Sequence, residues 1–228
     1  MDVSSVEEGL VVRAACQTAG VGQKGNVWES DGYKNLTFSV LLKPIFLPIA
    51  NRFMLTKVIS LAMVDFLKQE ISTETISIKW PNDIYWHDKK IGGNLIENEL
   101  EGAYITQSIL GIGLNINQEE FHSSAPNPIS LKQILGVEAD LEEILSKVIH
   151  GIVGGYRQLE ANFNMTQLAI RTLYVKNLYR KKGFYPYRDK EGEFKAEFDK
   201  IESDGHLVLK DEAGNLRCYA FKEVEFIL

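Results

Sequence analysis

Two short apolar runs, residues 10–15 and 36–43, flank a stretch that is unusually rich in glycine. Both runs are typical of strands, so the stretch between them is expected to be a loop that joins two strands of one sheet. Glycine leaves backbone N–H groups accessible, and such groups suit a phosphate or a carboxylate. A bare G-x-G pattern fits a hairpin tip equally well. The other residues of the stretch favour a binding loop: Gln17, Gly20, Gly22, Lys24, Gly25 and Trp28.

The rest of the chain predicts an α+β fold with a mixed or antiparallel sheet and packed helices. Helical spacing runs from about residue 48 to residue 68, and strands are expected at 76–80, 84–100 and 103–117, with a turn at 87–89. Asp140, with Glu143 three positions on, resembles a capping box that begins a helix over 141–163. A second helical stretch is expected to continue to about Lys182.

After Gly183 the pattern changes to short alternating strands separated by turn signals. A unit of about 45 residues is close to the lower limit for independent stability, so it is expected to pack on the main domain. The sequence therefore predicts two domains, residues 1–182 and 183–228.

The formal net charge of −6 argues against general affinity for nucleic acid or anionic membranes. The chain has only two cysteines, Cys16 and Cys218, far apart and without metal-like spacing, which fits a reducing cytoplasm. The first residues lack a signal-peptide pattern, and no apolar run reaches the length of a spanning helix. We therefore expect a cytoplasmic protein that binds neither DNA nor a membrane.

A second dense cluster is the KWPND segment, residues 79–83, which ends seven residues before Lys90. A lysine at a strand end, a turn fixed by proline and an Asn-Asp pair can bring a cation, a ring and a carboxylate to one rim. Gly92 and Gly93 let backbone approach a bound group, and Lys90 is expected to face the same rim. Taken singly, the lysines are more typical of a solvated surface and Asn82-Asp83 of a simple turn; the combination with the glycine-rich loop favours a site.

A third element is Gly111-Ile112-Gly113-Leu114-Asn115, within an apolar strand. Asn115 fits a ligand contact and a strand-end cap equally well. The four histidines show no mutual spacing for a metal site or a catalytic triad, so each is interpreted as structural. Cys16 has no patterned base nearby and is expected to be a small buried residue.

Three segments together resemble the biotin protein ligases. QTAGVGQKGNVW is similar to the adenylate-binding loop of that family, KWPNDIYWHDKKIGGNL to its lysine signature, and LGIGLNIN to its G-x-G-x-N strand. The order and spacing agree, and the resemblance covers roughly residues 9–228. It implies a class II synthetase-like catalytic domain followed by a small SH3-like β-barrel, without the winged-helix DNA-binding domain of the bifunctional members.

The resemblance implies a two-step enzyme that uses biotin and ATP with Mg²⁺. Biotinyl-5′-AMP forms first, and a lysine of a biotin carboxyl carrier protein then accepts the biotin. By resemblance, Lys90 reaches the carboxylate and α-phosphate oxygens, Lys79 and Asp83 handle phosphate and Mg²⁺, and Trp28 packs near the ligand. The remaining implied contacts to biotin or adenylate are Gln17, Gly20, Gly22, Gln23, Lys24, Gly25, Asn82, Gly92, Gly93, Gly113 and Asn115.

The chain departs from the family pattern in two places. Where the family loop has arginines, this chain has Val21, Gln23, Lys24 and Asn26. The family's N-terminal strand with its Ser-Thr-Asn segment is not matched by Ser4-Ser5-Val6, which predicts an incomplete N-terminus of the catalytic domain. A catalytically impaired or silent binding relative is therefore an alternative, a lipoate ligase is a weaker one, and homodimer formation is left open.

Overall fold

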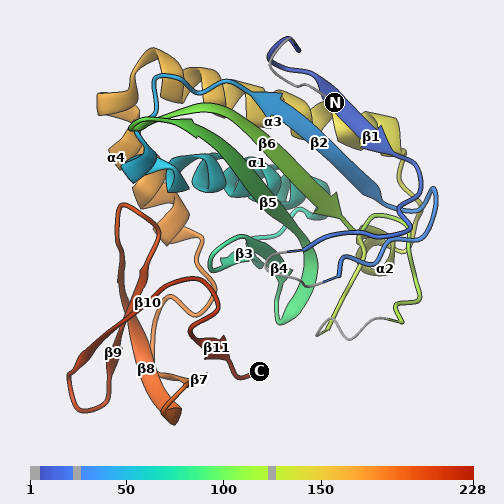
Figure 1. The fold of residues 1–228 in the computed structure, drawn as a ribbon. Helices are drawn as coiled ribbons and strands as arrows, with labels where there is room; N and C mark the ends of the chain where they lie inside the picture. Colours follow the sequence, from blue (N-terminus) through green and yellow to red (C-terminus); the bar gives the residue numbers. More distant parts are fainter. Residues whose placement is uncertain (1–5, 23–26, 123–126) are drawn as a thin grey trace.

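The main body is a six-stranded sheet in the order β1-β2-β6-β5-β4-β3, with every neighbouring pair antiparallel (Figure 1). The computed structural model describes residues 6–22, 27–122 and 127–228. The predicted strands on both sides of the glycine-rich loop are confirmed, and they pair through β2 with the centre of the sheet. The strands are β1 Val11–Ala14, β2 Leu36–Leu42, β3 Ile76–Lys79, β4 Asp83–Trp86, β5 Lys89–Glu101 and β6 Tyr104–Leu114.

Three long helices cover one face of this sheet, and they leave the other face for the site (Figure 1). They are α1 Phe53–Ile71, which follows the short turn η2 Ile49–Asn51, then α3 Leu141–Ala161 and α4 Phe163–Lys176. Helix α1 packs against α3, α4 and β5, and most of its residues are buried. A mostly apolar interface between helices and sheet makes this layer the core of the molecule.

The helix boundaries differ in part from the sequence expectation. The second predicted stretch ends at Lys176 rather than near Lys182, because Asn177 closes the last turn and donates to Leu173 O. Asp140 does cap α3, accepting from two backbone N–H groups, but the Glu143 carboxylate pairs with Lys147. The reciprocal capping box lies instead at the start of α2, Leu131–Leu135, a helix that the sequence did not predict.

The C-terminal residues form a separate five-stranded antiparallel sheet in the order β10-β9-β8-β7-β11, which agrees with the expected small SH3-like unit. It packs on the main body as predicted. The Phe221 ring lies between Phe53 and Trp80, at 5.8 and 5.4 Å between centroids, and the Trp80 indole donates to Gly205 O at 3.0 Å. The strands are β7 Tyr185–Asp189, β8 Gly192–Ile201, β9 Leu207–Asp211, β10 Leu216–Tyr219 and β11 Glu225–Phe226.

Buried apolar side chains form one continuous cluster from Leu36 in β2 to Phe226 in β11. The two sheets therefore share a core, and the division at residue 182 stays a prediction. Among the described helices, none has both the length and the apolar character needed to cross a bilayer.

Candidate functional site

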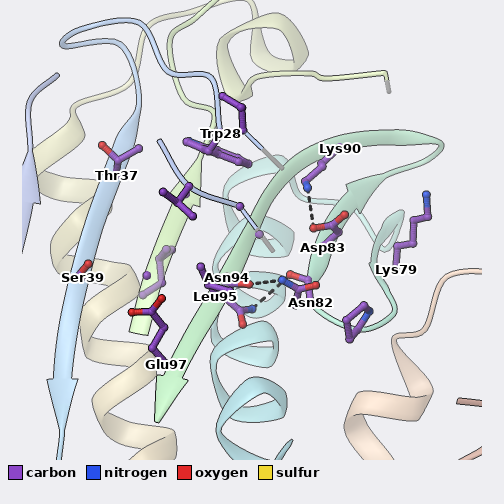
Figure 2. A pocket seen from close by; sticks show the side chains of 18 of the residues that line it. Trp28, Thr37, Ser39, Lys79, Asn82, Asp83, Lys90, Asn94, Leu95 and Glu97 are labelled. Atoms are coloured by element: carbon purple, nitrogen blue, oxygen red, sulfur yellow. Dashed lines mark hydrogen bonds and ion pairs between the residues drawn. The ribbon is translucent and has the colours of Figure 1, made fainter. Parts of the chain in front are cut away.

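A cleft of about 1060 Å³ lies on the sheet face opposite the helices, between the glycine-rich loop, strands β2, β4, β5 and β6, and the last residues of the chain (Figure 2). Strand β5 supplies its floor through residues 93–95 and 97, and β2 adds the hydroxyls of Thr37 and Ser39. The C-terminal sheet adds one wall through Val224, Glu225 and Phe226. A volume of this size is typical of pockets for small molecules and cofactors.

The KWPND turn lines this cleft, and hydrogen bonds join it to the C-terminal sheet, α4 and β5. The Trp80 indole reaches the C-terminal sheet, and the Tyr174 hydroxyl of α4 donates to Pro81 O at 2.6 Å. The Trp80–Pro81 peptide bond is cis. Next in the chain, the Asn82 side-chain amide donates to Asn94 O on β5. Asp83, the residue that follows, is therefore held at the rim by the bonds of Pro81 and Asn82, which precede it in the chain.

Lys90 and Asp83 form an ion pair inside the cleft, with 2.7 Å between Lys90 Nζ and Asp83 Oδ1 (Figure 2). Their side chains are 22% and 29% exposed, so both can meet a ligand. Gly93 lies beneath the pair, because a Cβ placed on it would be 3.0 Å from Asp83 Oδ1. A cation that is reachable and already oriented by a carboxylate can stabilise negative charge as it accumulates on a bound substrate.

Lys79 is in the cleft but extends away from the Asp83 and Lys90 pair (Figure 2). Its ammonium donates to the Tyr85 hydroxyl at 3.1 Å and lies 4.9 and 5.4 Å from the ring centroids of Tyr85 and Phe226. Burial lowers the pKa of Lys79, and the Asp83 carboxylate partly opposes that shift. The structure thus brings two of the three predicted catalytic groups together and places the third against the C-terminal wall.

The glycine-rich loop is anchored on β6 by its tryptophan. The Trp28 ring covers Gly113, where a Cβ would be 2.5 Å from the indole, and Lys90 Nζ lies 5.6 Å from the ring centroid. Trp28 N–H donates to Gly20 O at 2.9 Å, and a Cβ on Gly20 would be 2.3 Å from Trp28 O. Neither position has room for a side chain, because Gly113 lies directly under the Trp28 ring and Gly20 lies against the Trp28 backbone.

Nine of the predicted site residues line the cleft: Gln17, Gly22, Trp28, Lys79, Asn82, Asp83, Lys90, Gly93 and Gly113. Three others do not. Gly20 lies behind the Trp28 backbone, and Gly92 faces Met63 and Leu114 in the core. Asn115 donates to Ile129 O at 3.1 Å, so the strand-end alternative describes it better than the ligand contact.

The remaining predicted contacts, Gln23, Lys24 and Gly25, lie outside the described residues, as does Asn26. Cys16 is exposed rather than buried, so that expectation is wrong; its sulfur lies beside Gly32 in a loop that leaves it in contact with solvent. In the described ranges there is no group of three or more His, Cys, Asp or Glu side chains that could hold a metal ion.

Several cleft residues escaped the sequence argument, among them Ser39, Leu95 and Glu97. Strand periodicity could have found two of them, because residues 93, 95 and 97 must share one face of β5 once Gly93 is placed in the site. Asn94 also borders the cleft, but its side-chain amide bonds to Ser60 on α1, so periodicity gave no such signal for it. It is 4% exposed, and its side-chain oxygen has no hydrogen-bond partner in the part of the chain that the structure describes.

The comparisons with known proteins agree with this architecture. The model of the Biotin/lipoate A/B protein ligase family matches residues 1–115, just over half of the chain. This chain belongs to the Biotin/lipoate A/B protein ligase family.

Among the curated relatives, the Bifunctional ligase/repressor BirA of Bacillus subtilis is 31% identical over 151 residues, which cover 64% of this chain. The chain spans 45% of the length of that relative. The Biotin--[acetyl-CoA-carboxylase] ligase of Paracoccus denitrificans is 26% identical over 208 residues, covering 89% of this chain and 85% of the relative.

Among solved structures, the biotin protein ligase from Aquifex aeolicus in complex with biotin and ATP superposes with a TM-score of 0.76 at 26% identity. The match covers 96% of this chain and 89% of that one, so both sheets take part in the similarity.

Proposed function

We propose that this chain is an ATP-dependent biotin protein ligase, which forms biotinyl-5′-AMP and transfers biotin to a lysine of a biotin carboxyl carrier protein. The observation that carries the proposal is the ion pair between Lys90 and Asp83, set in a cleft beside Trp28 and Gly113. The family membership and the similarity to the Aquifex ligase in complex with biotin and ATP support the same assignment.

In the first step the carboxylate oxygen of biotin attacks the α-phosphorus of ATP, and the bond to the bridging oxygen breaks to release pyrophosphate. Two anions must approach each other, so a cation placed between them lowers the barrier. Lys90 is suited to this role because its ammonium is reachable from the cleft and its position is set by Asp83. Lys79, farther along the wall, adds positive charge for the nucleotide phosphates.

Magnesium would enter with the nucleotide. Mg²⁺ in proteins is commonly bound by one or two carboxylates together with substrate phosphates and water, so a preformed cage is not needed. Asp83 fits that donor set as a carboxylate in the cleft that pairs with Lys90 through one of its oxygens, and Glu97 and Glu225 also line the cleft. When bound, the ion would neutralise charge on the phosphates that Lys90 does not reach.

In the second step the neutral amine of the carrier lysine attacks the carbonyl of the mixed anhydride, and AMP leaves. Stacking of Trp28 over the β6 glycine supports a role in covering the ligand during the interval between the steps. We propose a cytoplasmic location and no DNA partner on the sequence argument alone, and the same holds for a homodimer. The silent relative and the lipoate ligase are the competing functions.

The test is pyrophosphate exchange into ATP, measured with biotin, with lipoate and with neither acid. The proposal predicts exchange that depends on biotin and is at least about 100-fold slower with lipoate. Exchange that is faster with lipoate would identify the chain as a lipoate ligase, and no exchange with either acid, together with measurable biotin binding, would identify a silent relative.

A further inference from the structure

A buried polar pair behind the cleft has no role in the function described above. Asn94 of β5 and Ser60 of α1 are 4% and 0% exposed, and they meet at 3.0 Å between Asn94 Nδ2 and Ser60 Oγ. They lie at the interface between α1 and the sheet, where Asn94 also borders a small cavity lined by both apolar and polar side chains. Burying a polar pair costs free energy unless its hydrogen bonds are made, so a buried pair that bonds to itself and to a neighbouring turn can specify a geometry.

The pair is connected to the cleft through Asn82. Asn94 N–H donates to Asn82 O at 3.2 Å, the Asn94 side-chain amide approaches the same oxygen at 3.4 Å, and the Asn82 side chain donates back to Asn94 O (Figure 2). These reciprocal bonds hold the two backbones together at the point where β4 begins. Asp83 is the next residue, and it pairs with Gly93 across the two strands.

We propose that Asn94 and Ser60 are positioning residues of this site, which set the Asp83 carboxylate and through it the Lys90 ammonium. Ser60 fixes the rotamer of Asn94, Asn94 fixes Asn82, and Asn82 fixes the start of β4. Asn94 borders the cleft, but its side-chain amide is bonded to Ser60 and Asn82, so both residues act through other groups and neither is catalytic. The inference rests on the proposed function only for its effect on rate; its structural part concerns the ion pair itself.

The variant that tests this is Asn94→Leu, which keeps the volume and removes the side-chain amide. The Asn94 side-chain oxygen is already unpartnered, so its loss costs little, but the loss of the amide leaves the buried Ser60 hydroxyl without its donor and is expected to lower the stability of the fold. Ser60→Ala is the second variant, and it preserves the test in the event that Asn94→Leu does not fold.

The chain offers a matched control four residues farther along the same face of β5. Asn98 accepts a hydrogen bond of 2.7 Å from the Ser108 hydroxyl, so Asn98→Leu also breaks a bond between an asparagine and a buried serine. Asn98 does not contact the KWPND turn and does not line the main cleft.

Two quantities are measured on each variant. The first is the rate at which an amine-reactive acetyl ester labels Lys90, followed by peptide mass spectrometry. Release of the ion pair should raise this rate several-fold in Asn94→Leu and in Ser60→Ala, and leave it unchanged in Asn98→Leu. The second is kcat and KM for biotin-dependent pyrophosphate exchange, where kcat should fall roughly 10-fold to 100-fold with little change in KM, as for a misplaced catalytic group.

The double variant Ser60→Ala with Asn94→Leu should be no slower than Asn94→Leu alone, because both changes interrupt one path. Labelling of Lys90 that is equal in Asn94→Leu and Asn98→Leu would overturn the proposal. If the wild-type protein shows no exchange while labelling of Lys90 still responds to Asn94→Leu, the proposed function fails and the positioning role stands.

Discussion

The KWPND turn and the glycine-rich loop border the same cleft but are held in different ways. The turn is fixed by side chains from three directions: Trp80 onto the C-terminal sheet, Tyr174 from α4, and Asn82 with β5. The described part of the loop near Trp28 is placed by the ring over Gly113, the backbone bond to Gly20 O and a short bridge between Val21 and Val27, and these two valines are 68% and 71% exposed. The comparison shows that the position of the charged groups depends on hydrogen bonds around the turn. The position of the loop over the ligand depends instead on the space that the glycines leave free.

If the KWPND turn orients the Lys90 ammonium through Asp83, Lys90→Ala should have the largest effect on activity. We expect biotin-dependent pyrophosphate exchange to fall about 1000-fold, as when a preorganised charge-stabilising group is removed. The free energy of unfolding should change by less than about 1 kcal/mol, because a partly exposed ion pair contributes little. Exchange at the wild-type rate would assign the chemistry to another residue; thermal unfolding of the same sample is the control.

The support behind the turn contains an unusual cation. Lys57 is 2% exposed, and its ammonium lies 5.0 and 5.9 Å from the ring centroids of Phe53 and Tyr174. Burial lowers the pKa of Lys57 to about 8, with a further contribution from Arg171. Below that pH both folded and unfolded chains carry the proton, and the cost of burying charge is fully present. Above it the folded chain loses the proton first, so stability should rise with pH between about 8 and the unfolded value of 10.5.

Lys57→Met should therefore raise the free energy of unfolding at pH 7 by about 3 kcal/mol and flatten its pH dependence above pH 8. Urea unfolding at pH 7 and pH 9.5 measures both. Lys147→Met, at an exposed lysine on α3, is the matched control and should show neither effect. Equal stability of Lys57→Met and wild type at both pH values would contradict the account of this buried charge.

At the glycine-rich loop, we expect activity to fall when a substitution fills the space under the Trp28 ring, rather than when a hydrogen bond is lost. In Gly113→Ala the new Cβ meets the Trp28 ring at 2.5 Å and displaces it, so exchange should fall roughly 10-fold to 100-fold through misplacement of the cover. Gly111→Ala narrows the same cleft, but its Cβ lies 3.6 Å from the Leu95 backbone oxygen. It should retain most activity, and Trp28 fluorescence should change only in Gly113→Ala. A matching loss in both variants would point to cleft volume instead.

The smallest effect is expected at Val21, which lines the cleft where the family pattern has an arginine. Val21→Arg adds a charge that can reach a phosphate, and such a hydrogen bond contributes about 1.5 kcal/mol or more. Release of labelled biotinyl-AMP should slow roughly tenfold. Val21→Gln, which adds length without charge, is the control; the same release rate in all three proteins would make position 21 neutral.

Much of this fold could be predicted from the sequence, because periodicity and turn residues act locally. The strands around the loop, the turn at residues 87–89 and the small C-terminal sheet all follow from such signals. The association of Lys90 with Asp83 was also predictable, because a strand, a tight turn and a returning strand must bring them close. Helix α2 was missed because five residues give no periodic signal.

The sequence could not predict the direction in which individual side chains point. Gly92 and Gly93 were both predicted in the site, yet adjacent residues of a strand face opposite sides, and only Gly93 lines the cleft. Lys79 was grouped with Asp83, but the apolar and aromatic surroundings that attract its side chain come from the distant residue Phe226. The role of Asn94 could not be predicted either, because its partner Ser60 lies on α1, far away in the sequence.

The most direct test of the central claim is to mix the protein with biotin and MgATP, without a carrier protein, and to identify the bound small molecule by mass spectrometry. The account predicts biotinyl-5′-AMP bound to the wild-type protein and released pyrophosphate, with neither product in Lys90→Ala. Recovery of unchanged biotin and ATP from a folded wild-type protein, or equal amounts of the adenylate from both proteins, would contradict it.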